Sequence, residues 1–390
     1  MSNTWKIYML AFISFMVSTS EYVIAGILDK VADSVNVSVA AAGQLITVFA
    51  IANAVGTPII MMITAKITPR KLLMLSLSTM VIGSILTVTL SGFGFLMVSR
   101  IILAVASGVF VAIAKIIAAK LVPPGKQAGA IGTVIIGFSA ALIIGVPIGR
   151  VVASVYEWKV IFGTIAILSL LAIFAVAKTI PSTFDQEVVP LSKQLSLLKN
   201  PKIGMGLGVT FFWQLGYAVL FAYIAPFLLA VTSMNGHEVS IALFAFGLAT
   251  LIGSKFGGFM TDRIGIPRSL IGGMVVHVIV LVLLSTIAKS TFVAIPLLML
   301  WGFSAWSSGP GLQFNLVSFA PEASGIILGL YGSFIQLGIA AAAGIGGIAA
   351  RGSILAISWV GAVSVAIAVC IAIVSFRSRS SIAMKERKTT

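Results

Sequence analysis

The sequence predicts an all-α polytopic membrane protein with twelve transmembrane helices in two six-helix halves, and both termini in the cytoplasm. Three observations predict it: the composition, the number of long apolar runs and the placement of the basic residues. Of the 390 residues, 59% are hydrophobic and 9% are charged, and the mean hydropathy is +1.15. Soluble domains carry roughly a quarter charged residues, so this chain could not cover a water-facing surface.

The transmembrane helices are predicted from the lengths of the apolar runs. A helix that crosses a bilayer needs about 17–25 mostly apolar residues. Twelve runs qualify: 5–28, 40–64, 72–91, 95–118, 130–154, 160–178, 203–229, 240–260, 268–288, 292–315, 324–350 and 354–376. The first is too long, and too polar near Ser18–Glu21, for a removable signal peptide.

The formal net charge is +15, and the placement of the basic residues indicates the orientation of the chain in the membrane and not a nucleic-acid partner. With the amino terminus inside, 17 of the 25 Lys and Arg residues fall in inner segments and only Lys30, Lys159, Lys289 and Arg351 in outer ones. Cytoplasmic loops of membrane proteins carry such an excess of Lys and Arg. We therefore expect the lipid bilayer as the partner of this chain, and no nucleic acid.

The longest polar interruption, Lys178–Lys202, contains three prolines and divides the spans six and six. We expect an N-terminal half at 1–178, a cytoplasmic linker at 179–202, a C-terminal half at 203–376 and a basic cytoplasmic tail at 377–390. Transporters built from two such halves bind substrate between them, near the membrane midplane. The other loops are short and leave no room for a separate soluble domain.

Enzymatic chemistry and cofactors are not indicated. The single cysteine, Cys370, allows no internal disulfide, and His237 and His277 have no metal-ligand spacing. The chain also contains no G-x-x-x-x-G-K-[ST] phosphate loop. We therefore expect neither an enzyme nor a bound cofactor or metal.

Among ten acidic residues, only Glu21 lies well inside a long apolar run. A carboxylate at membrane depth costs roughly 2.5–3.5 kcal/mol on insertion scales, and desolvation favours its neutral, protonated form. At a rise of 1.5 Å per residue, Glu21 lies about 24 Å along the first span, and Arg100 about 8 Å below the outer start of the fourth. Both positions fall in the outer third of the bilayer, so the two side chains are candidates for a pair.

A link on the expected inner face carries a recognisable motif. Its residues are Gly258, Asp262, Arg263, Gly265 and Arg268, in the form G-x-x-x-D-R-x-G-x-x-R. This form resembles the cytoplasmic signature of the major facilitator superfamily, and the resemblance implies a gating role for the link.

The likeness to this superfamily extends along the whole chain. Arg100, followed by Gly108, resembles its buried-arginine motif. The fifth span contains the pattern G-x7-G-V-P-x-G, which resembles the motif associated with antiporters. Its residues are Gly137, Gly145, Pro147 and Gly149. Small residues let helices approach closely, and a proline bends a span because it lacks a backbone donor.

Trp158–Phe162 resembles the W-R-x-x-F sequence that usually follows the antiporter motif. Two further segments, Phe221–Leu228 and Ala320–Ala323, resemble the twelve-span drug:proton antiporter group, and bacterial sugar-efflux and purine-efflux permeases look most similar. The resemblance implies a monomer in the bacterial plasma membrane that exports a small solute (purine base or nucleoside, sugar or drug) in exchange for protons. It also implies that Glu21 and Arg100 face a central cavity, where an ionised Glu21 pairs with Arg100 and a protonated one releases it. The alternatives are a permanent ion pair that only holds two helices together, and no contact between the two side chains.

Four positions depart from the family pattern. The first-half link has Lys66 and Pro69 where the family usually has Asp and Gly. Asp29 stands where relatives often have proline, and Arg150 follows the antiporter motif where a small residue is commoner. Because Arg150 lies close to a span end, snorkelling of its charge to the lipid headgroups is the expected explanation.

Candidate substrate-binding residues lie on the seventh and tenth spans: Trp213, Gln214, Tyr217, Tyr223, Trp306, Gln313 and Asn315. Aromatic rings with a few amides suit flat, neutral, partly polar solutes, although each ring could equally pack within the bundle or face lipid. His277 lies in the middle of the ninth span. We expect it to be a hydrogen-bonded structural residue rather than a proton relay.

Two other functions remain open beside proton-coupled export. One is a uniporter or importer of the same fold that uses no protons, which would be indifferent to Glu21→Gln and to a pH gradient. The other is a non-transporting membrane receptor or scaffold, which would show no solute flux. The short loops argue against a receptor, because no large surface for a partner protrudes.

Overall fold

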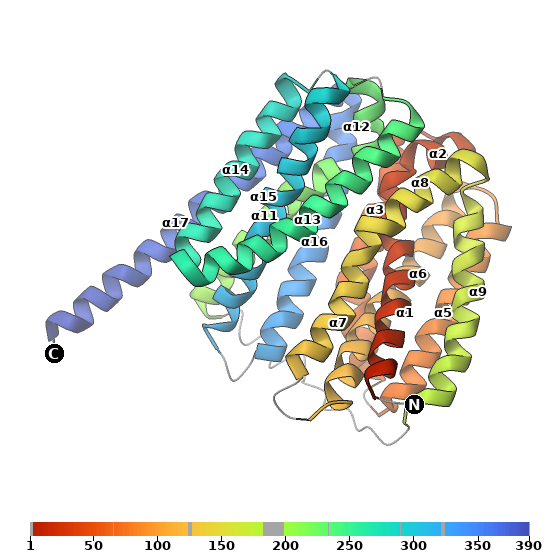
Figure 1. Ribbon diagram of the computed structural model, residues 1–390, viewed down its shortest axis with the longest axis horizontal. Coiled ribbons are helices and arrows are strands. Elements are labelled where there is room, and N and C mark those ends of the chain that lie inside the picture. Colours follow the sequence, from red (N-terminus) through yellow and green to blue (C-terminus); the bar gives the residue numbers. More distant parts are fainter. Residues whose placement is uncertain are drawn as a thin grey trace. The chain divides into compact units, whose positions relative to one another are not determined.

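The computed structural model describes residues 3–64, 66–123, 127–181, 199–232, 234–288, 290–320 and 324–389. In these residues all regular structure is helical, and twelve helices are long and apolar enough to cross a membrane. The predicted all-α, twelve-span architecture is therefore confirmed (Figure 1).

The first half of the chain contributes six spans. In chain order its elements are α1 (Asn3–Gly26), α2 (Leu28–Ser34), α3 (Val39–Ile51), the π-helical turn η1 (Ala52–Gly56), α4 (Thr57–Ile63), α5 (Pro69–Thr89), α6 (Phe93–Lys120), α7 (Gln127–Ala140), the π-helical turn η2 (Ala141–Gly145), α8 (Val146–Val155) and α9 (Lys159–Thr179). The second span consists of α3, η1 and α4, and the fifth of α7, η2 and α8.

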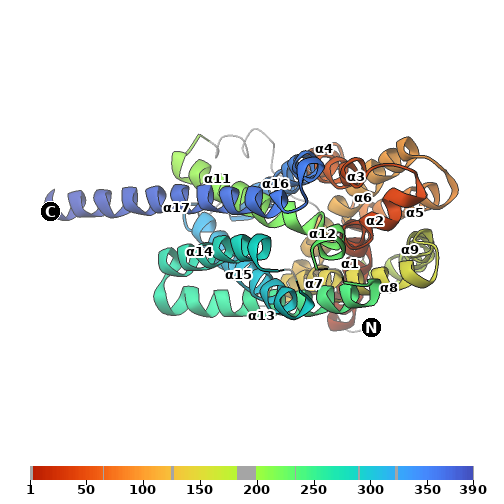
Figure 2. The same cartoon turned by 90° about the horizontal axis from the view of Figure 1, so that it is seen from above.

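The second half contributes the other six spans. Its elements are α11 (Pro201–Phe221), α12 (Ile224–Val231), α13 (Gly236–Ile264), α14 (Ile266–Thr286), α15 (Thr291–Val317), α16 (Ser324–Gly352) and α17 (Ala356–Thr389). Figures 1 and 2 show α17 continuing as one helix to the C-terminus, beyond the span predicted to end at residue 376.

Two spans change from α to π geometry at the same short pattern. Both η1 and η2 read A-x-x-x-G and are followed by x-P, which places Pro58 and Pro147 two residues past each π-helical turn. Proline has no N–H, so the carbonyls of Ala54 and Ile143, four residues earlier, lose their usual α-helical partners. A wider turn at that point absorbs the break without ending the span.

The predicted seventh span is interrupted. The sequence indicated one apolar run at 203–229, but α11 ends at Phe221 and α12 begins at Ile224. Pro226 lacks the N–H that would bond to the carbonyl of Ala222, so the helix breaks there. Tyr223 consequently lies in a turn and not within a continuous span.

The chain divides into two compact units, which are described separately below. Unit 1 comprises Met1–Val188, Tyr223–Leu229 and Met234–Phe244, and unit 2 comprises Val189–Ala222, Ala230–Ser233 and Ala245–Thr390. Most of α12 and the first turns of α13 therefore pack with the first half of the chain. The predicted linker at 179–202 stays a prediction, since residues 182–198 lie outside the described residues.

Each unit is built around one central helix. In α1 and in α11, 72% of the most apolar stretch lies buried, more than in any other candidate span of the described residues. In unit 1, α1 packs against α6, α7, η2, α8 and α9. In unit 2, α11 packs against α16 and α17. Most side chains in these stretches of α1 and α11 are therefore buried inside the protein and available for a polar site.

Candidate functional site

The structure brings Glu21 and Arg100 together inside unit 1. Glu21 on α1 is 8% exposed and Arg100 on α6 is 2% exposed. Arg100 Nη1 donates to the carbonyl of Ser20 at 2.7 Å, and Nη2 donates to the backbone carbonyl of Glu21 at 3.2 Å. The charge of Glu21 also attracts the guanidinium. The similar depths inferred from helix rise thus correspond to a real juxtaposition.

A third helix contacts the same guanidinium. Arg100 Cζ lies 4.3 Å from the centroid of the Phe49 ring on α3. Such a cation–π contact contributes about 0.5–2 kcal/mol, with the larger values where water is excluded. The sequence interpretation missed Phe49, because nothing in an isolated aromatic residue indicates which cation it will face.

The glycines of the antiporter motif allow close contact with α1. A Cβ placed at Gly137, Gly145 or Gly149 would collide with α1, and the residues met are Ala11, Thr19 and Val23 in that order. The sequence offset is 126 in all three pairs, so the fifth span runs parallel to α1 in constant register. Pro147 is buried within the same stretch. The motif therefore holds the helix that carries Glu21 at a distance that larger side chains would forbid.

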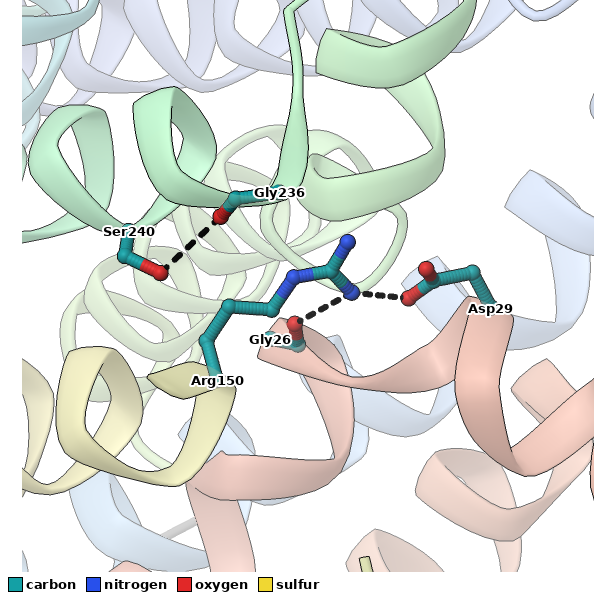
Figure 3. Close-up of polar contacts among 5 residues, drawn as sticks. All are labelled: Gly26, Asp29, Arg150, Gly236 and Ser240. Carbon is teal, nitrogen blue, oxygen red and sulfur yellow. Dashed lines mark hydrogen bonds and ion pairs between the residues drawn. The ribbon is translucent and has the colours of Figure 1, made fainter. Parts of the chain in front are cut away.

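Arg150 lies at the end of this motif and is not a snorkelling residue. Its side chain is only 2% exposed, and Nη1 forms an ion pair with Oδ1 of Asp29. The same nitrogen donates to the carbonyl of Gly26 at 3.3 Å (Figure 3). The snorkelling prediction is wrong because a counterion is available within unit 1. Asp29 and Arg150, two of the four departures from the family pattern, therefore neutralise each other's charge.

An aromatic cluster occupies unit 2. The ring of Tyr217 on α11 stacks on Phe221 at 5.5 Å and on Trp301 of α15 at 5.3 Å, and meets Trp306 edge-on at 6.1 Å. Phe246 of α13 stacks on Trp301 at 4.8 Å. The sequence indicated Tyr217 and Trp306, whereas Phe246 and Trp301 emerge only from the packing of three helices.

Two indole groups of unit 2 are fixed by hydrogen bonds. Trp301 Nε1 donates to Nε2 of His277 on α14 at 3.0 Å, and His277 is fully buried. The expected hydrogen bond of this histidine is thus present. Trp213 Nε1 donates to the carbonyl of Ala305 at 3.1 Å, one residue before Trp306. Trp213, Tyr217 and Trp306 therefore border one region of unit 2.

The remaining substrate candidates lie elsewhere. Gln214 is buried on α11, whereas on α15 Asn315 is buried and Gln313 exposed. Tyr223 belongs to unit 1, where its hydroxyl occupies the space that a Cβ at Gly43 would take. Tyr223 therefore belongs to a different unit from the residues of the aromatic cluster.

The residues of the cytoplasmic motif surround the junction of α13 and α14. Gly265 separates these helices with a φ of +81°, a conformation that favours glycine. Asp262, Arg263 and Arg268 are exposed, and Gly258 lies within α13. In the resembling segment Ala320–Ala323, residues 321–323 lie outside the described residues.

Comparison with known proteins agrees with this architecture. The family profile described as Major Facilitator Superfamily matches residues 10–343. The chain is 46% identical over 387 residues to the "uncharacterized MFS-type transporter YbcL" of Bacillus subtilis (strain 168), covering 99% of each chain. It is 28% identical over 379 residues to YtbD of the same organism, another "uncharacterized MFS-type transporter", covering 92% of this chain and 96% of that one.

Two solved structures share the fold. They are of a bacterial homolog to the human lysosomal transporter Spinster, in inward-facing occupied and unoccupied conformations. The TM-scores are 0.74 and 0.70, at 17% and 15% sequence identity, and each match covers 96% of this chain and at least 95% of the other. The profile match and the 46% identical relative show that this chain belongs to the major facilitator superfamily, a family of membrane transporters.

Proposed function

We propose that this protein is a secondary active transporter of the bacterial plasma membrane that exports a small organic solute in exchange for protons. The observation that carries the proposal is a buried carboxyl group, Glu21, beside a buried guanidinium, Arg100. Intramembrane ionisable groups are expensive and usually functional. Protonation of Glu21 removes its attraction for Arg100, and the arrangement of helices that depends on this attraction loses stability.

The size of this effect suits a switch. Removing one partner of a buried pair costs about 3–5 kcal/mol. Moving a two-state equilibrium from 1:99 to 99:1 takes about 5.5 kcal/mol. Protonation of Glu21 leaves the two backbone-carbonyl contacts of Arg100 in place, so under this proposal the lost attraction supplies part of the free energy that biases the transporter between two cavity arrangements. In this scheme the protein works as a monomer and the Gly258–Arg268 link acts as the cytoplasmic gate.

The aromatic cluster favours the proposal that the solute is flat, ring-containing and neutral, as a purine base is, and not a sugar. Trp306 meets the buried Tyr217 edge-on and is itself only half-buried, so its indole is the ring on which we propose that a planar solute stacks. Trp213, Gln214 and Asn315 would supply the few polar groups that orient a ligand in a mostly apolar pocket. In the described part of unit 2 no acidic side chain is buried, which disfavours a strongly cationic solute.

Transport by purified protein in proteoliposomes tests the function. Vesicles loaded with radiolabelled hypoxanthine, inosine, glucose or the neutral drug chloramphenicol are diluted into buffer at equal or lower pH. The inward proton gradient should accelerate efflux of at least one solute, and Glu21→Gln should reduce this acceleration at least about tenfold. Asp33→Asn removes an exposed acid of α2 and serves as the matched control, which should keep the gradient response.

The two alternatives give different results in the same assay. Efflux that proceeds equally with and without a gradient, in both wild type and Glu21→Gln, would identify a uniporter. No flux of any solute in the panel, from protein whose thermal unfolding shows it to be folded, would favour a receptor.

A further inference from the structure

We propose that α5 and α9 form a binding site for an anionic phospholipid at their inner end, the end that the basic residues predict to be cytoplasmic. In this site, called the α5–α9 lipid site, Lys71 and Lys178 hold the phosphate group of the lipid, and Leu75 and Phe174 contact its acyl chains. The inference goes beyond the proposed function, because it assigns a ligand to a surface that has no part in the proposed binding of protons and solute.

Two hydrogen bonds hold the ends of α5 and α9 together. Arg70, in the first turn of α5, donates through Nη2 to the carbonyl of Ala177 in the last turn of α9. At the other end of the pair, Lys159 Nζ donates to the carbonyl of Val88 at 3.1 Å. The two helices therefore run antiparallel and are joined at both ends (Figure 1).

The two lysines at the inner end of this pair are exposed and unpaired. Lys71 follows Arg70 and Lys178 follows Ala177, so the two lie at neighbouring helix ends. Both side chains are exposed, and neither has an ion-pair or hydrogen-bond partner among the described residues. An ammonium group offers three donors and no acceptor. Both lysines are therefore available to an anion from outside the chain.

Apolar side chains continue the same surface into the membrane. Leu75 lies one turn from Lys71 and is 51% exposed, and Phe174 lies one turn from Lys178 and is 65% exposed. Because an α-helix advances about 100° per residue, the exposed stripe of each helix lies about a quarter turn from the contact between them, in the same rotational sense. In an antiparallel pair this places both stripes on one side. The two lysines and the two apolar residues therefore form one surface.

The charged residues at the inner helix ends of unit 1 are all basic in the part of the chain that the structure describes. They are Lys6, Lys66, Arg70, Lys71, Lys120 and Lys178. The acidic residues described in unit 1 lie toward the opposite end, and they are Glu21, Asp29, Asp33, Glu157 and Glu238. A basic residue near the membrane surface contributes about 1 kcal/mol to the attraction of anionic lipid. A headgroup with net negative charge is therefore favoured over a zwitterionic one, whose amine the lysines repel.

An isolated lysine at a span end also reaches the headgroups without any specific site. The α5–α9 lipid site differs because two cations converge on one phosphate while the acyl chains of the same molecule contact Leu75 and Phe174. Free phosphate carries the same charge but has no acyl chains, so it should bind far more weakly than the lipid.

Native mass spectrometry of the full-length protein tests the site. Purified protein is mixed with equal amounts of phosphatidylglycerol and phosphatidylethanolamine that have the same acyl chains, and the wild type should retain phosphatidylglycerol in preference. Lys71→Gln/Lys178→Gln should lower the ratio of the two retained lipids at least about fivefold, whereas Lys71→Arg/Lys178→Arg should keep it. Lys199→Gln/Lys202→Gln removes the same charge from exposed positions of unit 2, and this matched control should keep the wild-type ratio.

Thermal unfolding separates a lipid from free phosphate. Phosphatidylglycerol should raise the melting temperature of the wild type, because a ligand of the native state stabilises it. The rise should be smaller in Lys71→Gln/Lys178→Gln and in Phe174→Ser, which loses acyl contact but no charge. Inorganic phosphate should cause no comparable rise.

Three results would overturn the proposal. The first is a wild type that retains both lipids equally. The second is an equal loss of phosphatidylglycerol in Lys199→Gln/Lys202→Gln, which would show that only net charge matters. The third is an equal stabilisation by inorganic phosphate. None of these measurements involves solute transport, so a failure of the proposed function would leave them unaffected.

Discussion

Arg100 and Arg150 are two buried guanidinium groups that both depend on the second half of α1. Arg100 donates to the carbonyls of Ser20 and Glu21, and Arg150 donates to that of Gly26, the last residue of α1. The final carbonyls of a helix lack internal partners and carry a partial negative charge. This charge favours the contact between Arg150 of α8 and Gly26, whereas Ser20 and Glu21, which Arg100 of α6 contacts, lie more than one turn before the end of α1.

A double-mutant cycle on the ion pair of Asp29 and Arg150 should reveal its dependence on both partners. Asp29→Ala leaves Arg150 buried without a counterion, and should lower the free energy of unfolding by about 3–5 kcal/mol near neutral pH. Asp29→Ala/Arg150→Met removes both charges and should cost clearly less, about 1 kcal/mol. Denaturant unfolding of purified protein measures both.

The control for this cycle is Asp33→Ala, which removes an exposed carboxylate from the same helix. Its effect should stay within about 0.5 kcal/mol. A double variant that is as unstable as Asp29→Ala would contradict the interpretation, because it would locate the damage in lost packing and not in the uncompensated charge.

Replacing His277 should disturb the aromatic cluster through Trp301. His277→Leu leaves the indole N–H of Trp301 buried without an acceptor, which should cost about 1–3 kcal/mol of stability. His277→Gln can supply an amide oxygen and should recover part of the loss. Thermal unfolding followed by tryptophan fluorescence measures both effects. His237→Leu, at an exposed position, is the control, and equal stability of His277→Leu and wild type would show that the bond contributes nothing.

At the scale of helices, the contact between α1 and the fifth span depends on the absence of side chains. A Cβ at Gly137 would meet the backbone of Ala11, which can move only if a whole helix shifts. Gly137→Ala should therefore destabilise the protein by about 1–3 kcal/mol. Gly132 lies on the same helix, α7, with nothing within 4 Å of its hypothetical Cβ.

Gly132→Ala is the matched control for this helix contact. It should stabilise the protein by about 0.5–1 kcal/mol, since alanine loses less conformational entropy than glycine in a helix. Apparent melting temperatures of the two variants should thus move in opposite directions. Equal shifts would mean that helix propensity, and not contact with α1, governs both positions.

Much of the helical architecture could be predicted, because an apolar run of about 20 residues is itself the signal for a span. Deviations within spans were harder to predict. Pro58 and Pro147 indicate that a backbone bond is missing, but only the structure shows that π-helical turns absorb the break. At Pro226, by contrast, the span ends and restarts. The same chemical cause has two structural outcomes, which the sequence alone does not distinguish.

The candidate site was predicted less completely for the same reason. Glu21 and Arg100 could be linked because each is costly at membrane depth and their heights agree. Asp29 and Arg150 were both noticed, but 121 residues separate them and one lies beyond the first apolar run. Phe246 and Trp301 carry no signal in the sequence, since apolar aromatics in a span usually pack or face lipid. Contacts across helices therefore had to come from the structure.

At the scale of the molecule, the two units differ in their buried chemistry. The buried charged side chains of the described residues are Glu21, Arg100 and Arg150, and all lie in unit 1. The aromatic cluster lies in unit 2. Under the proposed function, protons act on one unit and the solute stacks in the other. Coupling then requires that proton binding and solute binding both shift the equilibrium between the same two conformations of the protein.

The orientation of the whole chain in the membrane is a further prediction, because the charge asymmetry and an even number of spans put both termini on the inner side. In a Cys370→Ser background, Ser91→Cys and Ser353→Cys occupy exposed links that should face outward, and Asn200→Cys an exposed link that should face inward. A membrane-impermeant maleimide applied to intact cells should label the first two at least about tenfold faster than the third. Asn200→Cys should reach the same rate after permeabilisation, which controls for its intrinsic reactivity. Rapid labelling of Asn200→Cys in intact cells would contradict this orientation and place both termini on the outer side of the membrane.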